Sequence, residues 1–185
     1  MTDTSPAILP HWPTVPACYG WLALDARGRW RLKDERVEHG GLLDFLNANY
    51  ACDEAGNWLV HNGPQRVFVE LEAAPWVLRL LPHDVLQTHS GRTVTAAAPV
   101  LVDEDGRVSL QTDLGPAAID DRDLALFLSE VKDEHGRAVD EATLFALLDG
   151  QSTAPLRWRS LPVRFAPGSE IPGQLGFQRK PLTTA

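Results

Sequence analysis

Short stretches of alternating polar and apolar residues run through most of the chain. The clearest stretch, residues 66–72, alternates throughout, which is typical of a half-buried strand. Residues 76–81 are apolar on both faces except at Arg79, which predicts a strand inside a sheet. If these two segments form a hairpin, Glu70 should pair with Arg79. Further strands are expected at residues 19–24, 30–32, 58–60, 84–88, 92–95, 99–102, 107–111 and 156–165.

Three other segments carry apolar residues at helical spacing, and they cover residues 41–50, 121–131 and 141–148. Asp140 precedes the third segment as an N-cap, and Gly150 ends it. Strands and helices do not alternate regularly, so the predicted fold class is α+β. We expect two small subdomains with antiparallel, hairpin-rich, roll-like sheets and about three helices.

The expected organisation of the chain has four parts. An extended, Pro-rich arm comes first, and two α+β subdomains follow it before a loop and tail. The arm covers residues 1–16, the N-terminal subdomain 17–82, the C-terminal subdomain 83–165, and the loop and tail 166–185.

An Asp-x-x-Gly spacing recurs at Asp25, Asp53, Asp103 and Asp133. The aspartate can accept from the backbone N–H two residues on, and the glycine adopts positive φ without strain. The flanking patterns predict hairpin turns at the first and third sites, a helix-to-strand turn at the second and a helix-to-helix turn at the fourth. A calcium loop would need a later glycine than Gly106 and a glutamate beyond it, so metal binding is not expected here.

The charge distribution limits the classes of partner. The 185 residues carry a formal net charge of −8, which disfavours nucleic acid and anionic membranes as partners. Residues 154–185 nevertheless hold five basic residues against one acidic residue, and such a segment could capture a small anion or dock an acidic face. The N-terminus lacks the pattern of a signal peptide, and Cys18 and Cys52 have no metal-site spacing. We therefore expect a cytoplasmic protein with reduced thiols.

Several motifs together resemble a known family. The first half carries Asp25-x-x-Gly28-x-Trp30 and Asp53-x-x-Gly56-x-Trp58, and residues 67–77 read VFVELEAAPWV. With the opening around Cys18, the segment 111–115 and the strand 157–165, these motifs resemble the bacterial domain-of-unknown-function family numbered 1285. The resemblance implies two small α+β subdomains with repeated motifs, and a role in signalling or regulation has been suggested for such proteins. Asp113 stands where the family favours Asn, the helical stretch 121–149 is longer, and no functional residue carries over.

Catalytic patterns are weak. Ser129 and Lys132 match S-x-x-K, but the partner motifs are missing. His83 and His89 flank a short predicted strand near Asp84, and Cys52 has no basic neighbour that would lower its pKa. Solvated histidines and a packing cysteine account for these residues, so no catalytic residue, metal or cofactor is predicted.

The candidate ligand-binding residues are Arg157, Trp158, Arg159 and Arg164. An aromatic side chain among arginines suits an anion or the acidic segment of a partner. The alternative is an inward tryptophan on an edge strand with solvated arginines. Our hypothesis is a non-enzymatic binding or regulatory module that recognises a small anionic ligand or a protein partner. The alternatives are a hydrolase with dispersed His, Asp and Ser residues, and a structural subunit of a homo-oligomer, whose oligomeric state the sequence leaves open.

Overall fold

Two mixed sheets hold the strands of the computed structural model, which describes residues 13–152 and 154–181. The first sheet has the order β3-β2-β1-β6-β5-β4, and the second has the order β13-β14-β15-β10-β11-β12-β7-β8-β9. Both contain parallel pairs, so the prediction of antiparallel sheets is correct for the hairpins only. The strands of the first sheet are β1 (Ala17–Leu24), β2 (Trp30–Leu32), β3 (Glu35–Arg36), β4 (Tyr50–Cys52), β5 (Trp58–Asn62) and β6 (Gln65–Leu71).

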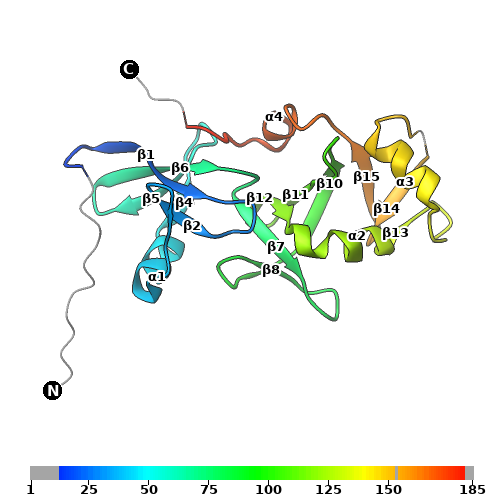
Figure 1. Ribbon diagram of the computed structural model, residues 1–185, viewed down its shortest axis with the longest axis horizontal. Coiled ribbons are helices and arrows are strands. Elements are labelled where there is room, and N and C mark those ends of the chain that lie inside the picture. The colour runs from blue at the N-terminus through cyan, green and yellow to red at the C-terminus, as the bar shows by residue number, and fades with distance from the viewer. Residues whose placement is uncertain (1–12, 153, 182–185) are drawn as a thin grey trace.

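The second sheet runs through the middle and right of Figure 1, beyond the first sheet at the left. Its strands are β7 (Trp76–Leu80), β8 (Leu86–Thr88), β9 (Thr93–Val94), β10 (Ala96–Val102), β11 (Val108–Thr112), β12 (Gly115–Ile119), β13 (Val131–Lys132), β14 (Leu156–Trp158) and β15 (Leu161–Phe165). The expected α+β class is confirmed. The predicted arm lies mostly outside the described residues, and the predicted division of the chain between residues 82 and 83 stays a prediction.

The chain repeats one topology twice. In the first sheet β1 lies parallel to β6 at the centre, with β2 and β3 on one side and β5 and β4 on the other. In the second sheet β10 lies parallel to β15, with β11 and β12 on one side and β14 and β13 on the other. Each repeat has a helical segment after its third strand. The strands β7, β8 and β9 connect the repeats and extend the second sheet along β12.

Four short α-helices and one 3-10 turn accompany the described strands. The third predicted helix is confirmed at Glu141–Leu148 (α3), where the Asp140 side chain accepts from Thr143 N. The second begins as a 3-10 turn at Asp121–Asp123 before α2 (Leu124–Glu130). The remaining helices are α1 (Gly40–Ala48) and α4 (Ile171–Leu175), and α4 lies where the sequence predicted a loop.

All four Asp-x-x-Gly turns have the same hydrogen bonds. In each, the Asp Oδ1 accepts from the backbone N–H groups two and four residues on, and the Gly N–H donates to the Asp carbonyl. The turns at Asp25 and Asp103 follow the first strand of each repeat and close hairpins, as predicted. The turn at Asp53 instead joins β4 to β5, and that at Asp133 follows β13, so the two predicted helix turns are wrong. The reason is that a short strand separates helix from turn in both repeats.

We expect Asp103→Ala to lower the free energy of unfolding by about 2 kcal/mol, because two N–H groups lose their acceptor in a buried site. Asp103 is 1% exposed, and it accepts from Asp105 N at 3.0 Å and Arg107 N at 2.8 Å. Asp133→Ala is the matched control, since its side chain is 29% exposed and water can replace it. Urea unfolding of the two variants should give the larger loss for Asp103→Ala, and equal losses would contradict this reasoning.

Two predicted strand arrangements are wrong, the first because distant segments pair and the second because a tight turn divides the segment into two strands. The segments 66–72 and 76–81 do not form a hairpin, because β6 pairs with β1 and β5 whereas β7 pairs with β12 and β8. Arg79 accordingly pairs with Asp123, not with Glu70. The expected single strand 156–165 is a hairpin, β14–β15, whose turn places Arg159 and its neighbour at positive φ.

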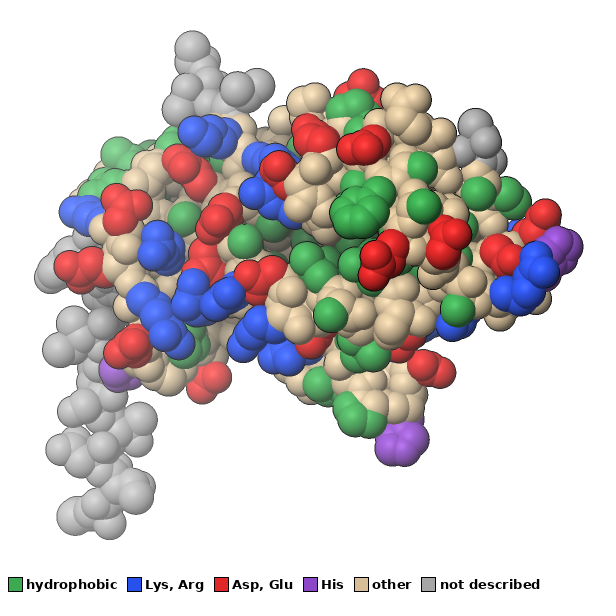
Figure 2. Space-filling view, turned by 45° about the vertical axis from the view of Figure 1, so that its right-hand side comes forward, with side chains coloured by type: hydrophobic (Ala, Val, Ile, Leu, Met, Phe, Trp, Pro, Cys, Tyr) green, Lys and Arg blue, Asp and Glu red, His purple; other side chains and the backbone are tan. Residues whose placement is uncertain are grey.

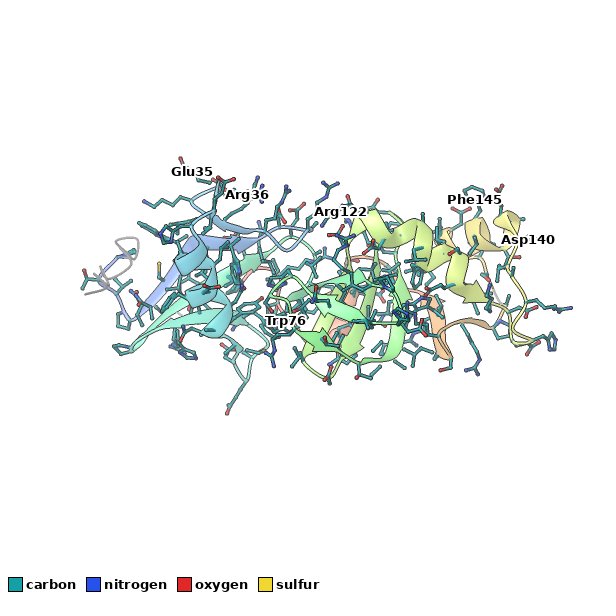
Figure 3. All side chains as sticks on the ribbon, turned by 90° about the horizontal axis from the view of Figure 1, so that it is seen from below. Glu35, Arg36, Trp76, Arg122, Asp140 and Phe145 are labelled. Atoms are coloured by element: carbon teal, nitrogen blue, oxygen red, sulfur yellow. The ribbon has the colours of Figure 1, made fainter. Side chains whose placement is uncertain are left out.

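Aromatic side chains from both sheets pack where the sheets meet. Tyr50 contacts Trp30, Trp58 and Trp76 at centroid distances of 5.0, 4.8 and 5.2 Å. Figure 3 shows Trp76 at this junction. The C-terminal segment returns over the same region, because α4 leads back along the top of Figure 1 towards the first sheet. Arg179 O accepts from the backbone N–H of Leu71 in the first sheet, and α4 contacts β11 in the second, so this segment ties the two sheets together.

Candidate functional site

Two turns, one from each sheet, contact each other at the junction. The first is the turn that begins at Asp25, and the second joins β8 to β9 at residues 88–92. A Cβ atom placed on Gly28 would lie 2.2 Å from the Cβ atom of His89, so only glycine permits this approach. The backbone of Gly28 is therefore packed directly against the His89 side chain.

The turn at Thr88 has two of the three hydrogen bonds described for the aspartate turns, and it was not predicted from the sequence. Thr88 Oγ1 accepts from Arg92 N at 3.1 Å, and the Thr88 carbonyl accepts from Gly91 N at 2.8 Å. The residues read Thr-x-x-Gly-Arg, with a hydroxyl oxygen in place of the carboxylate. This spacing is the signal in the sequence that could have revealed a fifth turn.

A cavity of about 310 Å³ opens beside the paired turns. It is small for a ligand pocket, since typical pockets hold roughly 300–1,000 Å³. Four arginines from both sheets line it, and we call it the four-arginine cavity. They are Arg27 and Arg29 from the first sheet's turn, Arg79 from β7 and Arg122 from the 3-10 turn, accompanied by Gly28, Val77, Gln87, Thr88, His89, Gly91 and Asp120.

Each of these arginines is oriented by one carboxylate. The ion-pair distances lie between 2.6 and 2.8 Å, and the arginine side chains are between 39% and 50% exposed. The pairs are Arg27 with Asp121, Arg29 with Asp25, Arg79 with Asp123 and Arg122 with Asp120. Figure 3 labels Arg122, which lies in the 3-10 turn after β12, and Figure 2 shows basic and acidic side chains next to each other on the surface. The arginines are thus held in place while remaining open to solvent.

Asp120 is strongly perturbed by its neighbours. Its burial raises the pKa, but hydrogen bonds from the side chain and backbone of Arg122 outweigh burial and lower the pKa to about 2. The pKa of Asp123 is also lowered, since burial is again outweighed by hydrogen bonds from Arg79 and from the backbone of Leu80. Both carboxylates are therefore ionised at neutral pH and keep their arginines positioned.

The carboxylates leave one part of each guanidinium unused. Arg27, Arg79 and Arg122 each donate through Nε and Nη2, and Arg29 donates through Nε alone. Among residues 13–152 and 154–181, no group accepts from Nη1 of any of the four. A guanidinium has five N–H donors, so each arginine can still donate to a ligand.

His89 forms one wall of the cavity. Its ring stacks on Trp76 at 5.4 Å, and its Nδ1 lies 3.4 Å from Val77 N as an acceptor. Burial lowers the pKa of His89 to about 4, against a smaller raising effect of Asp25, so the imidazole is neutral at pH 7. Its Nε2 is shielded from solvent and has no hydrogen-bond partner within the described part of the chain.

The residues singled out from the sequence lie at the other end of the second sheet. Trp158 is fully buried against Phe127, and its Nε1 donates to Glu130 at 2.8 Å. Arg159 covers the Trp158 ring and also pairs with Glu130 at 2.8 Å. Arg164 is exposed on β15, where it donates to the side chain of Gln174. The structure therefore brings Trp158 and Arg159 together around Glu130 and leaves Arg164 apart.

Arg157 and Arg159 line a separate cavity of about 500 Å³. Its charged lining residues are three basic and four acidic ones, so the carboxylates outnumber the cations: Lys132, Arg157 and Arg159, against Asp84, Glu130, Asp133 and Glu134. Ser129 and Lys132 also lie here, but Lys132 Nζ contacts the Ser129 carbonyl and not its hydroxyl. The binding role of these residues stays a prediction.

The remaining candidate residues do not form a catalytic or metal-binding group within the described ranges. His83 is an exposed turn residue at positive φ. Cys18 and Cys52 are free thiols, and burial raises the pKa of each, with Asp53 adding to the rise at Cys52. Within the described ranges, no group of three or more metal-ligating side chains occurs. None of the helices in those ranges has the length and hydrophobicity of a membrane span.

The repeated sheets have the fold of DUF1285 family proteins. One from Silicibacter pomeroyi DSS-3 matches with a TM-score of 0.53 and 12% sequence identity, over 92% of this chain and 92% of that chain. Another, from Shewanella baltica OS155, matches with a TM-score of 0.42 and 16% identity, over 58% of this chain and 90% of that chain. The resemblance noted in the sequence is confirmed at the level of the fold.

The chain belongs to the family described as "Protein of unknown function (DUF2946)", whose model matches residues 1–182. No curated protein matches the chain in sequence. Neither family description names a ligand or a reaction, so the chemistry of the cavities is what indicates a function.

Proposed function

We propose that the protein is a non-enzymatic binding module that takes a small anion in the four-arginine cavity. The observation that carries this proposal is the convergence of Arg27, Arg29, Arg79 and Arg122 from two sheets on one small cavity. Within the described part of the chain, each guanidinium keeps free N–H donors at its Nη1 atom, and charge-assisted hydrogen bonds to anions are roughly twice as strong as neutral ones. Guanidinium donors arranged in this way are suited to binding a small dissolved anion.

The geometry of His89 favours binding over hydrolysis. A hydrolytic His/Asp pair needs a carboxylate within hydrogen-bond reach of the imidazole, to orient it as a base. In the described residues, the hydrogen-bond partner of His89 is the backbone N–H of Val77, and its Nε2 has none. The imidazole therefore lacks the orienting carboxylate that the hydrolase alternative requires.

Arg29→Gln should weaken anion binding at least tenfold, because it removes one cation from the cavity. Arg137→Gln is the matched control: Arg137 holds the same position in its turn, pairs with Asp133 at 2.9 Å as Arg29 pairs with Asp25 at 2.7 Å, and does not line the cavity. Isothermal titration with phosphate, sulfate, malonate and acetate at constant ionic strength measures the effect. If no anion binds the wild type, or both variants bind equally, the proposal is wrong.

The predicted site around Arg157 and Arg159 remains a second proposal, supported by the cavity that these two residues line. The triple variant Arg157→Ala, Arg159→Ala and Arg164→Ala separates the two sites in the same titration. Loss of anion binding in the triple variant with retention in Arg29→Gln would move the site to that cavity. A partner's acidic segment would be the favoured ligand there only if pull-down of such a peptide depended on the same arginines.

A further inference from the structure

The donors of the four-arginine cavity are arranged for a particular class of anion. In three of the four arginines, the carboxylate already occupies the fork formed by Nε and Nη2. This fork is one of the two edges of a guanidinium that can bind a ligand carboxylate through two parallel hydrogen bonds. On these three arginines a carboxylate ligand would therefore find one of the two edges already taken.

The donors that remain come from separate directions. Arg27 and Arg29 stand on the turn of the first sheet, Arg79 stands on β7, and Arg122 stands beyond the end of β12. Arg27, Arg79 and Arg122 each offer Nη1, and Arg29 offers both of its Nη atoms. Oxygens that diverge in three dimensions can accept from several such donors at once, whereas the two oxygens of a carboxylate lie in one plane.

The cavity is also small and polar. Besides the arginines, its lining includes the side chains of Gln87 and Thr88 and the two turn glycines, in a volume of about 310 Å³. Gly28 and Gly91 lack side chains that would fill this space. The volume accommodates a compact, multiply charged group with a short substituent.

We infer that the four-arginine cavity binds a phosphoryl group, carried by inorganic phosphate or by a small phosphate monoester. The inference rests on the proposed function and narrows it to tetrahedral oxyanions. A phosphoryl group presents three or four oxygens and a charge near −2, which matches several singly donating guanidinium groups. Its oxygens reach arginines of both sheets, so one group bridges the junction.

The test is titration at pH 8 and constant ionic strength with inorganic phosphate, glycerol 3-phosphate and malonate, which are all close to divalent anions at this pH. We expect inorganic phosphate or glycerol 3-phosphate to bind at least tenfold more tightly than malonate. Tighter binding of glycerol 3-phosphate indicates a phosphate ester as the ligand, and equal binding of the two indicates the free phosphoryl group as the feature recognised.

Variants of the cavity arginines distinguish a failure of the phosphoryl inference from a failure of the proposed function. Arg29→Gln should weaken phosphate binding at least tenfold and Arg137→Gln should retain it, with unchanged circular dichroism as the check on folding. Arg27→Gln is a second variant, because its partner Asp121 is 56% exposed and tolerates the loss of its cation. If malonate binds as tightly as phosphate and Arg29→Gln weakens the binding of both at least tenfold, the phosphoryl inference is overturned while the proposed function stands. If none of the anions binds, or phosphate binding survives both cavity variants, both are overturned.

Discussion

Gly28→Ala is expected to lower the free energy of unfolding by about 3 kcal/mol, through overpacking and unfavourable backbone geometry. Gly28 has a φ of 73°, in the left-handed region that favours glycine. Its added Cβ atom would lie 2.2 Å from the Cβ atom of His89 and 2.9 Å from Cγ, and neither atom is the end of a flexible side chain. The two turns at the junction would have to separate.

Gly136→Ala is the matched control for this variant. Gly136 occupies the same position in the turn at Asp133, with a φ of 77°, and a Cβ atom there would meet no atom within 4 Å. Gly136→Ala should lower the free energy of unfolding by about 1 kcal/mol, which is the cost of the backbone conformation alone. Denaturant unfolding of both variants measures the difference, and equal losses would mean that the two turns are not in contact in solution.

A second large effect is expected from acid. Burial lowers the pKa of His89 from 6.5 to about 4, so between these pH values the unfolded chain binds a proton that the folded chain does not. The contribution of His89 to the free energy of unfolding is therefore at its full value above pH 6.5 and falls as the pH drops towards 4. Since one pKa unit corresponds to about 1.4 kcal/mol, the loss amounts to up to about 3 kcal/mol.

His89→Gln isolates this contribution, because glutamine cannot titrate. The pKa values of Asp25 and Asp120 are lowered from 3.8, since hydrogen bonds from Arg29 and Arg122 outweigh burial, and their contributions are lost only below that value. Urea unfolding between pH 4.5 and 7 should therefore give a flatter profile for His89→Gln than for the wild type. Identical slopes would show that His89 titrates normally in the folded protein.

Local chemistry made part of the fold predictable. The Asp-x-x-Gly turns follow from side-chain acceptors and glycine at fixed offsets, and α3 follows from the cap at Asp140 and the stop at Gly150, where φ is 65°. The α+β class follows from the irregular order of the segments. These features depend on residues within one turn of the chain, so a single sequence contains them.

The candidate site was not predictable in the same way. Arg27 lies in the turn after β1 and Arg122 in the 3-10 turn after β12, and neither has an unusual sequence neighbourhood. They converge because β7 pairs with β12, a parallel pairing between segments that the sequence pattern placed in different units. The sequence instead predicted a site at Arg157 and Arg159, because composition shows where charge is dense along the chain. The convergence of distant residues depends on tertiary structure, which composition does not show.

The parallel pair at the centre of each repeat also bears on synthesis of the chain. Hairpins such as β1–β2 and β10–β11 form between neighbouring segments, and they can close as soon as they leave the ribosome. The pairs β1–β6 and β10–β15, by contrast, join the first strand of a repeat to its last. Each nascent sheet thus keeps an open central edge until its sixth strand emerges. The strands β7, β8 and β9 are made between the two repeats, and they provide the template on which β12 then assembles.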